Sequence, residues 1–476
     1  MKRRSVHLIG AVALAVGAVA GLLIVTLPAS ASSPRSDTAA ERVPIRWFVG
    51  LGAGTDPSQV AVQQQVVADF NASQTTISLT LEVVGNSAAY ETLRTQIAQG
   101  NAPDIVGQMG IFASNSFYGQ WLDLSPIITA TGYDLSDFDP ELVNLYCEAG
   151  QGLTGLPLDV YPSYIYYNED LFAQAGLAYP PHQYGQPYTD TVHGGAWTID
   201  KLEEIAKLLT LDNNSRNATN PAFDVGHIVQ FGYLTQWNGA RGEATLFGTH
   251  SFVDANGDAQ IPANWRTAFQ WYYDGMWGSQ PFIPNTPYEL SDHFGNSNSF
   301  NSGHIAMAHC HPWYLSQLGS NVHWDIAAVP AYSATVTAQI DSNSFRILRA
   351  SDHPTEAFQA MTYLIGTAAL TLTNYYHGFP ARTSLQTSAL HSLKLAHPGV
   401  DWQVMVDSIH YLDNPNHEGY MPNFQKAEDR LQQFRDLYHG TAGLNINVEL
   451  DRLRSDLQWI FHERLVYLPL VMRNHK

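Results

Sequence analysis

Charged residues are scarce in this chain of 476 residues, and basic residues are the scarcest. Only 14% of the residues are charged, 24 Lys and Arg stand against 43 Asp and Glu, and the formal net charge is -19 at pH 7. A chain with this excess of negative charge repels nucleic acid and anionic membrane surfaces, which argues against both as binding partners. Aromatic residues make up 12% of the chain. Few charges and many aromatic rings favour a surface that binds neutral polar ligands.

Repeats, catalytic motifs and cysteines are also few or missing. No internal repeat is visible, and motifs such as H-E-x-x-H and G-x-S-x-G do not occur. Metalloprotease or serine-hydrolase chemistry of those kinds is therefore not indicated. Cysteine is limited to Cys147 and Cys310. In an exported protein these two could form a disulfide, and the alternative is a pair of buried apolar thiols.

The N-terminus predicts export. A basic segment at residues 2–4 precedes an apolar run over residues 8–27, and the small-x-small pattern that signal peptidase accepts follows at residues 29–31. Residues 1–31 are therefore predicted to be a signal peptide. The apolar run is long enough to stay uncut as an N-terminal membrane anchor instead. No cysteine lies near the cleavage site, so a lipoprotein is not expected. Either way the chain is expected outside the cytoplasm, in the periplasm or at the cell surface.

Length and composition predict more than one lobe. Cleavage after Ala31 would leave 445 residues, more than one hydrophobic core usually supports. Residues 32–42 lack the apolar content to pack and are predicted to be a linker. Strand and helix patterns then alternate, which predicts α/β lobes with central sheets. The predicted strands are Val43–Gly50, Ile77–Val84, Ile105–Gln108 and Leu153–Pro157, and the predicted helices are Gln59–Asn71, Ala89–Gln99, Asp139–Cys147, Ile199–Leu209, Pro262–Trp277 and Thr355–Gly366.

The most informative segment is GLPLDVYPSYIYYNEDLFAQAGL at Gly155–Leu177. It has the pattern of a strand, a kink at Asp159–Pro162, an aromatic strand and a short helix. Pro162 cannot donate a hydrogen bond to a neighbouring strand, so the sheet is expected to break there. A break of this kind suits a crossover between two lobes.

This segment resembles the hinge of the family 1 extracellular solute-binding proteins, the receptors of ABC importers, a family that includes maltose-binding protein. Further segments resemble the family in the same order along the chain, and together they span nearly all of the mature sequence. They are TLRTQIAQGNAPDIV at Thr92–Val106, FNSGHIAMAHCHPW and WDIAAVP within Phe300–Pro330, GFPARTSL at Gly378–Leu385, and LNINVELDRLRSDLQWIF at Leu444–Phe461.

The resemblance implies an α/β fold with two lobes, like that of periplasmic binding proteins, a hinge, and a ligand cleft between the lobes. It assigns residues 43–158 and 343–410 to lobe one, and residues 159–340 and 411–462 to lobe two. A C-terminal tail remains at residues 463–476, whose apolar VYLPLV either packs as an added strand or serves as a surface-sorting tail.

The same assignment bears on the cysteines. Cys147 falls in lobe one and Cys310 in lobe two, so a disulfide would lock the hinge unless both residues lay beside it. We therefore expect two unbonded, buried thiols.

The resemblance and the residue types together predict the ligand site. Aromatic rings pack against the C–H faces of sugars, and Asp, Asn, Gln and Arg side chains bond their hydroxyls. Trp313 ends HCHPW, where the resemblance implies a stacking tryptophan, and Trp237 lies in a polar stretch interrupted by glycines. The alternative for both is a place in the core.

Seven further residues are predicted to contact the ligand, and the alternative for each is hydrogen bonding or packing within the protein. They are Asp159 and Tyr161 at the first crossover, Asn343 at the second, Gln108 and Met109 after the strand of PDIV, Asn86 after the second strand, and Arg382 in FPARTS.

Two patterns imitate metal sites. Residues 254, 256 and 258 have the spacing of a calcium loop, but Trp265 replaces the glutamate required at the twelfth position, so a hairpin turn is predicted. The three histidines and one cysteine within residues 304–311 match no common zinc spacing. No metal and no cofactor is predicted.

Two classes of function remain. A binding protein would capture a carbohydrate, an oligosaccharide first of all, and deliver it as a monomer to an ABC permease in the membrane, with a non-sugar polar solute as the alternative ligand. A secreted glycoside hydrolase would instead need two carboxylates that flank a cleft. Because no covalent chemistry is indicated, the protein is predicted to be a receptor and not an enzyme.

Overall fold

The structure is a computed structural model, and it describes residues 41–52, 54–148, 150–413 and 421–463. The predicted signal peptide, most of the predicted linker and nearly all of the predicted tail lie outside these residues. Within them, no helix has both the length and the apolar character needed to cross a membrane.

The first sheet has six strands in the order β13-β6-β12-β3-β1-β2. β1, β2 and β3 are parallel to one another, whereas β12 runs antiparallel to both β3 and β6. The predicted strands and helices of this region are confirmed to within a few residues, with two exceptions described below. The strands are β1 (Val43–Val49), β2 (Ile77–Val83), β3 (Ile105–Met109), β6 (Leu156–Pro162), β12 (Ile340–Ile347) and β13 (Phe379–Pro380), and the helices around them are α1 (Pro57–Ser73), α2 (Asn86–Ala98), α3 (Ile111–Asn115), α4 (Ser125–Thr131), α5 (Pro140–Asn144), α11 (Pro354–Leu364), α12 (Ala369–Tyr376) and α13 (Thr383–Ala396).

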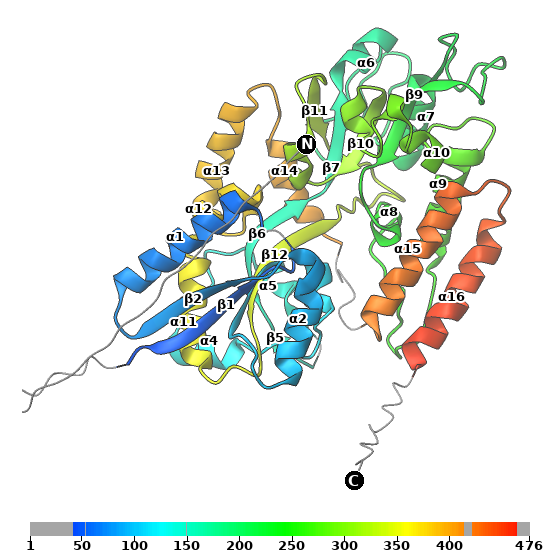
Figure 1. The fold of residues 1–476 in the computed structure, drawn as a ribbon. Coiled ribbons are helices and arrows are strands. Elements are labelled where there is room, and N and C mark those ends of the chain that lie inside the picture. The colour runs from blue at the N-terminus through cyan, green and yellow to red at the C-terminus, as the bar shows by residue number, and fades with distance from the viewer. Residues whose placement is uncertain (1–40, 53, 149, 414–420, 464–476) are drawn as a thin grey trace, which may run out of the picture. The chain divides into compact units, whose positions relative to one another are not determined.

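Both faces of this sheet are buried. Successive side chains of a strand point to opposite faces, so neighbouring Trp47 and Phe48 of β1 enter different cores. Trp47 packs in a cluster that includes Phe358 of α11, and Phe48 packs in one that includes Leu93 of α2. Figure 1 shows α1 and α2 on either side of β1 and β2.

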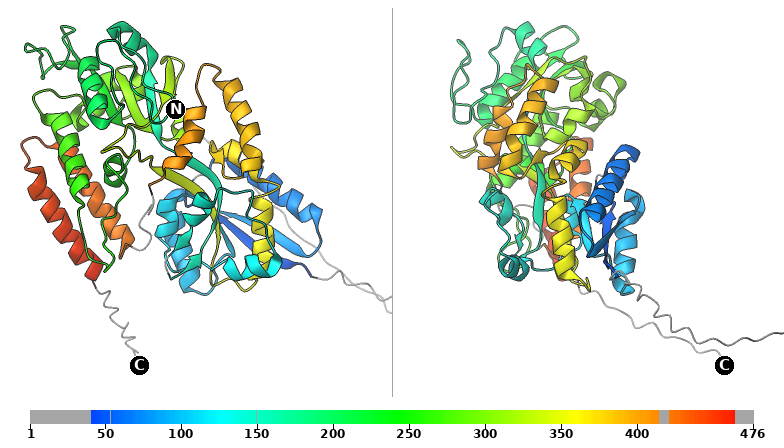
Figure 2. Two further views of the ribbon diagram at one scale, coloured as in Figure 1. Left: turned by 180° about the vertical axis from the view of Figure 1, so that it is seen from behind. Right: turned by 90° about the vertical axis from the view of Figure 1, so that its left-hand side faces the viewer.

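The second sheet has five strands in the order β11-β7-β10-β9-β8. Figures 1 and 2 show its elements as a group separate from the first sheet, with α15 and α16 beside α9. The molecule is therefore an α/β protein with two lobes, as predicted. The strands are β7 (Tyr164–Asn168), β8 (Leu211–Asp212), β9 (Ile228–Thr235), β10 (Ile305–Cys310) and β11 (Trp324–Ala327), and the helices are α6 (Glu169–Ala175), α7 (Ile199–Leu209), α8 (Ala240–Thr245), α9 (Ala263–Trp277), α10 (Thr286–Glu289), α14 (Gln403–Ser408), α15 (Phe424–Gly440) and α16 (Ile446–His462).

The first crossover lies where the proline predicted it. β6 ends at Pro162 in the first sheet and β7 begins at Tyr164 in the second, so Ser163 alone joins them. Pro162 pairs with Ile340 at the start of β12, which brings the second crossover alongside the first. The backbone N–H of Ser163 donates to the carbonyl of Gln339 at 2.8 Å and ties the two crossing segments together.

The third passage between the lobes comes earlier than the predicted boundary at residue 410. α14 packs against β7 and β11 of the second sheet. Just before α14, the backbone N–H of Asp401 donates to Asp325 Oδ1 at 2.8 Å, and Trp402 contacts Trp324 edge to face. Residues from about 401 onward therefore pack with the second lobe.

The cysteine predictions are met in part. Cys310 is buried in β10, as expected, and its thiol donates to the carbonyl of Gln236 at 3.2 Å. The predicted burial of Cys147 is wrong, because the helix expected over 139–147 already ends at Asn144. Cys147 is instead exposed and begins a short ribbon of β4 (Cys147–Glu148) and β5 (Gly152–Leu153), and the two cysteines are not bonded to each other. The ribbon is the second exception, since the strand predicted at Leu153–Pro157 is divided between β5 and β6.

Candidate functional site

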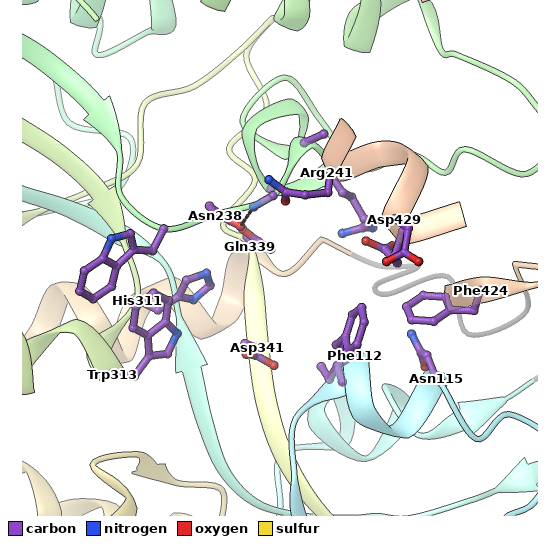
Figure 3. Close-up of a pocket in the computed structure, with 17 residues that line it drawn as sticks. Phe112, Asn115, Asn238, Arg241, His311, Trp313, Gln339, Asp341, Phe424 and Asp429 are labelled. Carbon is purple, nitrogen blue, oxygen red and sulfur yellow. Dashed lines mark hydrogen bonds between the residues drawn. The ribbon is translucent and has the colours of Figure 1, made fainter. Parts of the chain in front are cut away.

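A pocket of about 460 Å³ lies in the cleft between the lobes. This volume is within the range of small-molecule binding sites. Figure 3 shows aromatic rings at both ends of the pocket and polar groups between them. The lining residues are Ile111, Phe112 and Asn115 from the first lobe; residues 237–242, His311 and Trp313 from the second; Gln339 and Asp341 from the second crossover; and Phe424, Glu428, Asp429 and Gln432 from α15.

Trp237 and Trp313 form one end of the pocket. Their ring planes are parallel to within 5° and their centroids lie 6.3 Å apart. Trp237 follows β9 in a left-handed backbone conformation, and its Nε1–H donates to the carbonyl of Ser297 at 2.7 Å. Trp313 follows Pro312, which ends β10 because proline cannot continue the strand ladder. Trp237 is 44% exposed, so an indole face remains available to a ligand.

His311 stands behind Trp313 and is held by the first crossover. Its ring stacks on Trp313 with centroids 5.6 Å apart, and its side chain is almost fully buried. His311 Nδ1 lies 2.6 Å from the carbonyl oxygen of Tyr161. That oxygen can only accept, so Nδ1 carries a hydrogen, and whenever the ring is neutral Nε2 is its acceptor.

Asp341 is the carboxylate of the second crossover that reaches the pocket. Its Oδ1 accepts the backbone N–H of Ser342 at 2.8 Å, and the carboxylate lies over Gly110. Burial raises the pKa of Asp341, and the opposing effects of His311 and of the backbone N–H groups of Ser342 and Ile111 do not cancel the rise. The groups around Asp341 therefore stabilise its ionised form by less than burial destabilises it.

Two polar contacts brace the wall formed by residues 238–242. Asn238 hydrogen-bonds Gln339 across to the second crossover. Arg241 forms an ion pair with the fully buried Asp413 at 2.5 Å, and the other oxygen of Asp413 accepts the backbone N–H of Ile340. The positive charge of Arg241 is thus largely neutralised from behind.

The opposite end of the pocket joins the lobes directly. Phe112 of α3 and Phe424 of α15 lie with ring centroids 5.5 Å apart. Nearby, Arg94 of α2 donates to the side-chain oxygen of Gln425. The first lobe therefore touches α15 at this end, whereas the tryptophan pair belongs wholly to the second lobe.

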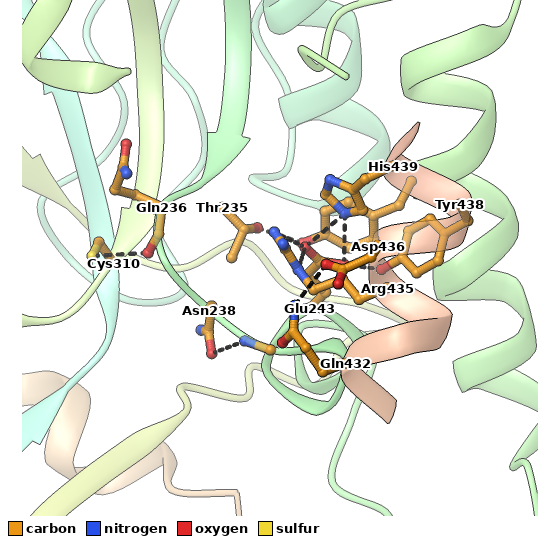
Figure 4. A network of polar contacts seen from close by, with 12 residues as sticks. Thr235, Gln236, Asn238, Glu243, Cys310, Gln432, Arg435, Asp436, Tyr438 and His439 are labelled. Carbon is orange, nitrogen blue, oxygen red and sulfur yellow. Dashed lines mark hydrogen bonds and ion pairs between the residues drawn. The ribbon is translucent and has the colours of Figure 1, made fainter. Parts of the chain in front are cut away.

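A buried ionic network supports the wall from the far side (Figure 4). Glu243 of α8 is inaccessible to solvent and pairs with Arg435 at 2.8 Å and with His439 at 3.1 Å, and Tyr438 donates to it as well. Burial alone would raise the pKa of Glu243, but Arg435 and His439 outweigh that effect and lower it to about 2. The network fastens α8 to α15, the two helices that carry much of the pocket.

The predicted ligand residues divide into two groups. Trp313 and Trp237 line the pocket, and Asp159, Tyr161, Asn343, Gln108, Met109, Asn86 and Arg382 do not. Asp159 and Asn343 are paired residues of β6 and β12, and Asn343 Nδ2 donates to Tyr161 Oη at 2.8 Å. Tyr161 in turn donates to the carbonyl of Tyr376, and burial raises the pKa of Asp159 well above its usual value.

The remaining four residues also lie away from the pocket. Met109 is a core residue, and Gln108 beside it is 1% exposed. Asn86 opens α2 and donates to the carbonyl of Gly50 at 3.1 Å. Arg382 bonds Asp137, the hydroxyl of Tyr133 and the carbonyl of Ile365, so it clamps its own loop.

Several lining residues were missed from the sequence. His311 was considered only as a metal ligand, and Asp341 only as part of a hinge segment. Phe112, Asn238 and Gln339 follow strands or precede crossovers, but no spacing marks their side chains as facing a cleft. The α15 residues have no local signal at all, because the chain returns to the cleft there through tertiary packing.

The expected hairpin turn is confirmed. Asp254 Oδ1 accepts the backbone N–H groups of Asn256 and Asp258, and Val253 bridges to Ala259. Across the residues that the structure describes, no group of three His, Cys, Asp or Glu side chains is arranged to hold a metal ion.

Comparison with known families identifies the chain. The family of bacterial extracellular solute-binding proteins matches residues 54–370, about two thirds of the sequence. The chain therefore belongs to this family, and the resemblance found in the sequence is confirmed. No functionally curated protein matches the sequence.

Solved structures confirm the two-lobe fold. An ABC substrate-binding protein of Listeria monocytogenes in complex with cycloalternan matches with a TM-score of 0.65 and 19% identity, over 88% of this chain and 98% of that one. The sugar-binding protein MalE of Xanthomonas citri matches with a TM-score of 0.65 and 17% identity, over 88% and 97%. A cyclic α-maltosyl-1,6-maltose binding protein of Arthrobacter globiformis matches with a TM-score of 0.61 and 15% identity, over 88% and 99%.

Proposed function

We propose that this protein is an exported, extracytoplasmic receptor that captures a carbohydrate, first of all an oligosaccharide, between its two lobes and delivers it to the permease of an ABC importer. The parallel pair of Trp237 and Trp313 in the cleft carries the proposal, because exposed indole faces bind the C–H faces of sugar rings. Amide, carboxylate and imidazole groups around the pair supply partners for hydroxyls.

Similar structures support the choice of ligand class. Cycloalternan and cyclic maltosyl-maltose are the ligands named for two of them. In this role the protein acts as a monomer that binds its ligand, closes around it and releases it. The role requires no covalent chemistry. Closure would tighten the contact between Phe112 and Phe424, which already joins α3 to α15.

The predicted ligand residues take two proposed roles. Trp313 and Trp237 contact the sugar, together with His311, Asp341 and Asn238. Asp159, Tyr161 and Asn343 support the crossover beneath the pocket, because Tyr161 and Asn343 hydrogen-bond other protein groups and Asp159 is the strand partner of Asn343.

A thermal-shift screen tests the proposal. The mature chain is heated with a panel of mono-, di- and oligosaccharides, and the expected result is a raised melting temperature for at least one of them. A ligand at a hundred times its Kd stabilises the folded state by about 2.7 kcal/mol. The Trp313→Ala variant should lose the shift while still melting cooperatively. The absence of any shift across neutral, amino and acidic sugars would contradict the proposal.

A second measurement separates the receptor from a hydrolase. The sugar that gives the largest shift is incubated with the protein, and the mixture is examined for shorter products. We expect the sugar to be recovered intact. Release of products that requires a cleft carboxylate such as Asp341 would assign the protein to the glycoside hydrolases instead.

A further inference from the structure

His311 offers an unused acceptor to the pocket. Its side chain is 3% exposed and lines the cleft, and Nδ1 is committed to the carbonyl of Tyr161. No hydrogen bond from Nε2 to another protein group is seen among the residues that the structure describes. Nε2 of the neutral ring is therefore an acceptor that a ligand lying in the pocket can satisfy with a donated hydrogen bond.

Asp341 offers a second acceptor on the same pocket wall. Figure 3 shows Asp341 and His311 as neighbouring side chains that project into the pocket. The two interact electrostatically, but among the described residues no ion pair joins them, so the ring nitrogen and the carboxylate are not in direct contact. Burial raises the pKa of Asp341, so a cationic group placed beside this carboxylate would stabilise its ionised form.

The lining of the pocket as a whole carries a negative charge, like Asp341 itself. Asp341, Glu428 and Asp429 contribute three carboxylates, and Arg241 is the one Lys or Arg among the described lining residues. The guanidinium of Arg241 is already matched by the buried Asp413. The lining carboxylates would therefore repel an anionic ligand. A cationic ligand would be attracted by these carboxylates and by the exposed indole face of Trp237.

From this arrangement, and resting on the proposed carbohydrate function, we infer that the cleft selects an amino sugar, whose protonated amine is held between Asp341 and the Nε2 atom of His311 while its ring stacks on the tryptophan pair. An ammonium group has three donors and no acceptor, which matches two acceptors that line the same pocket. N-acetylation removes the charge, and a uronic acid reverses it, so both modifications should weaken binding.

Isothermal titration of the mature chain with matched sugars tests this inference. The disaccharide of β-1,4-linked glucosamine and cellobiose differ at C2, where one has an ammonium group and the other a hydroxyl; glucosamine and glucose form the same pair at the length of one ring. Each pair is measured at pH 6.5 and low salt, beside diacetylchitobiose and digalacturonic acid. We expect the amino sugar to bind at least about tenfold more tightly than its neutral match, with digalacturonic acid the weakest ligand.

Variants locate the preference. Asp341→Asn keeps the shape and removes the charge, so the ratio between amino sugar and neutral sugar should fall towards one. Asp274→Asn, an exposed change on α9, is the matched control and should leave the ratio unchanged. Equal or tighter binding of the neutral sugars, or a ratio that Asp341→Asn does not alter, would overturn the inference and leave the carbohydrate receptor standing. If no sugar of any charge binds, the proposed function itself fails.

Discussion

Trp237 and Glu243 lie six residues apart in the chain and on opposite sides of the same wall. Trp237 is 44% exposed at the mouth of the pocket, and Glu243 is fully buried in the ionic network behind it. The wall between them, residues 238–242, lines the pocket on one side. Side chains that face the cleft can contact a ligand, whereas the side chains behind the wall are paired with other protein groups. Changes on the first side should alter binding, and changes on the second should alter folding.

The crossover strands repeat this difference at shorter range. Asp341 and Asn343 are two residues apart on β12, opposite Tyr161 and Asp159 of β6. Asp341 lines the pocket, and Asn343 is bonded to Tyr161 within the protein. Both side chains lie beside Gly110, so their place on the strand does not separate them; the hydrogen bond that commits Asn343 to Tyr161 does.

The largest effect is expected behind the wall. Glu243→Ala removes the carboxylate that balances Arg435 and His439, and an unpaired buried charge costs about 3–5 kcal/mol of unfolding free energy. Urea denaturation measures it. Glu91→Ala, which breaks an exposed pair with Arg94, is the control and should cost less than about 1 kcal/mol. Equal losses for the two variants would show that the network does not hold the wall.

A change on the pocket side of the wall should reduce the affinity for the ligand. Trp313→Ala is expected to weaken sugar binding by about 2–4 kcal/mol, as for other buried aromatic anchors, and to destabilise the fold less than Glu243→Ala does. Calorimetry with the sugar found by thermal shift measures the change. Trp459→Ala, at an exposed tryptophan on α16, should change neither quantity. An unchanged Kd in folded Trp313→Ala would assign this ring to the core.

Arg382 was predicted to bind ligand, but in the structure it pairs with Asp137 away from the pocket, so its replacement should affect stability and not binding. Burial opposes the ionisation of its partner Asp137, but hydrogen bonds from Ser384, Arg382 and Thr383 prevail and lower the pKa of Asp137 to about 2. The pair therefore contributes stability above the unfolded pKa near 4 and loses it as the pH falls through about 2, a total of about 2 kcal/mol.

The Arg382→Ala variant should lose part of this acid-sensitive stability and keep the affinity for sugar. Denaturation between pH 6 and pH 2 and calorimetry at pH 7 are the measurements, with Arg452→Ala, at an exposed pair with Glu449, as the control. A clear loss of sugar affinity in Arg382→Ala would return this residue to the ligand site.

A further effect, which depends on pH, is expected at Asp159. Burial raises the pKa of this carboxyl, so between the unfolded and the folded pKa the native state binds more protons than the unfolded state. Stability is then complete below about pH 4 and declines as the pH rises towards the folded pKa. Asp159→Asn removes the titration, so its melting temperature should match the native one at pH 4 and exceed it at pH 8. A constant difference across this range would show that Asp159 is ionised in the folded protein.

Local pattern was a good guide to the scaffold and a partial guide to the site. Proline chemistry placed the crossover at Pro162, and apolar periodicity placed α7 at Ile199–Leu209 without error. Trp313 was placed in the cleft by the family resemblance, and Trp237 because a large ring in a polar segment has little core to join. Asp159, Gln108 and Arg382 were placed in the site by their positions at strand ends and loops. The pairing of Asp159 with Asn343 and of Arg382 with Asp137 is tertiary, and no local pattern specifies it.

The sequence by itself determined the family, the α/β lobes, the first crossover and the aromatic character of the cleft. Each of these depends on residue types within single segments and on the order of such segments along the chain. Only the tertiary structure decided which polar groups face the pocket. Phe112, Asp341 and Phe424 lie more than 300 residues apart at their extremes and meet because two crossovers and α15 bring three segments to one cleft. Side-chain direction at such a meeting point follows from long-range packing and the pairing of buried charges, and neither is encoded in the spacing of neighbours.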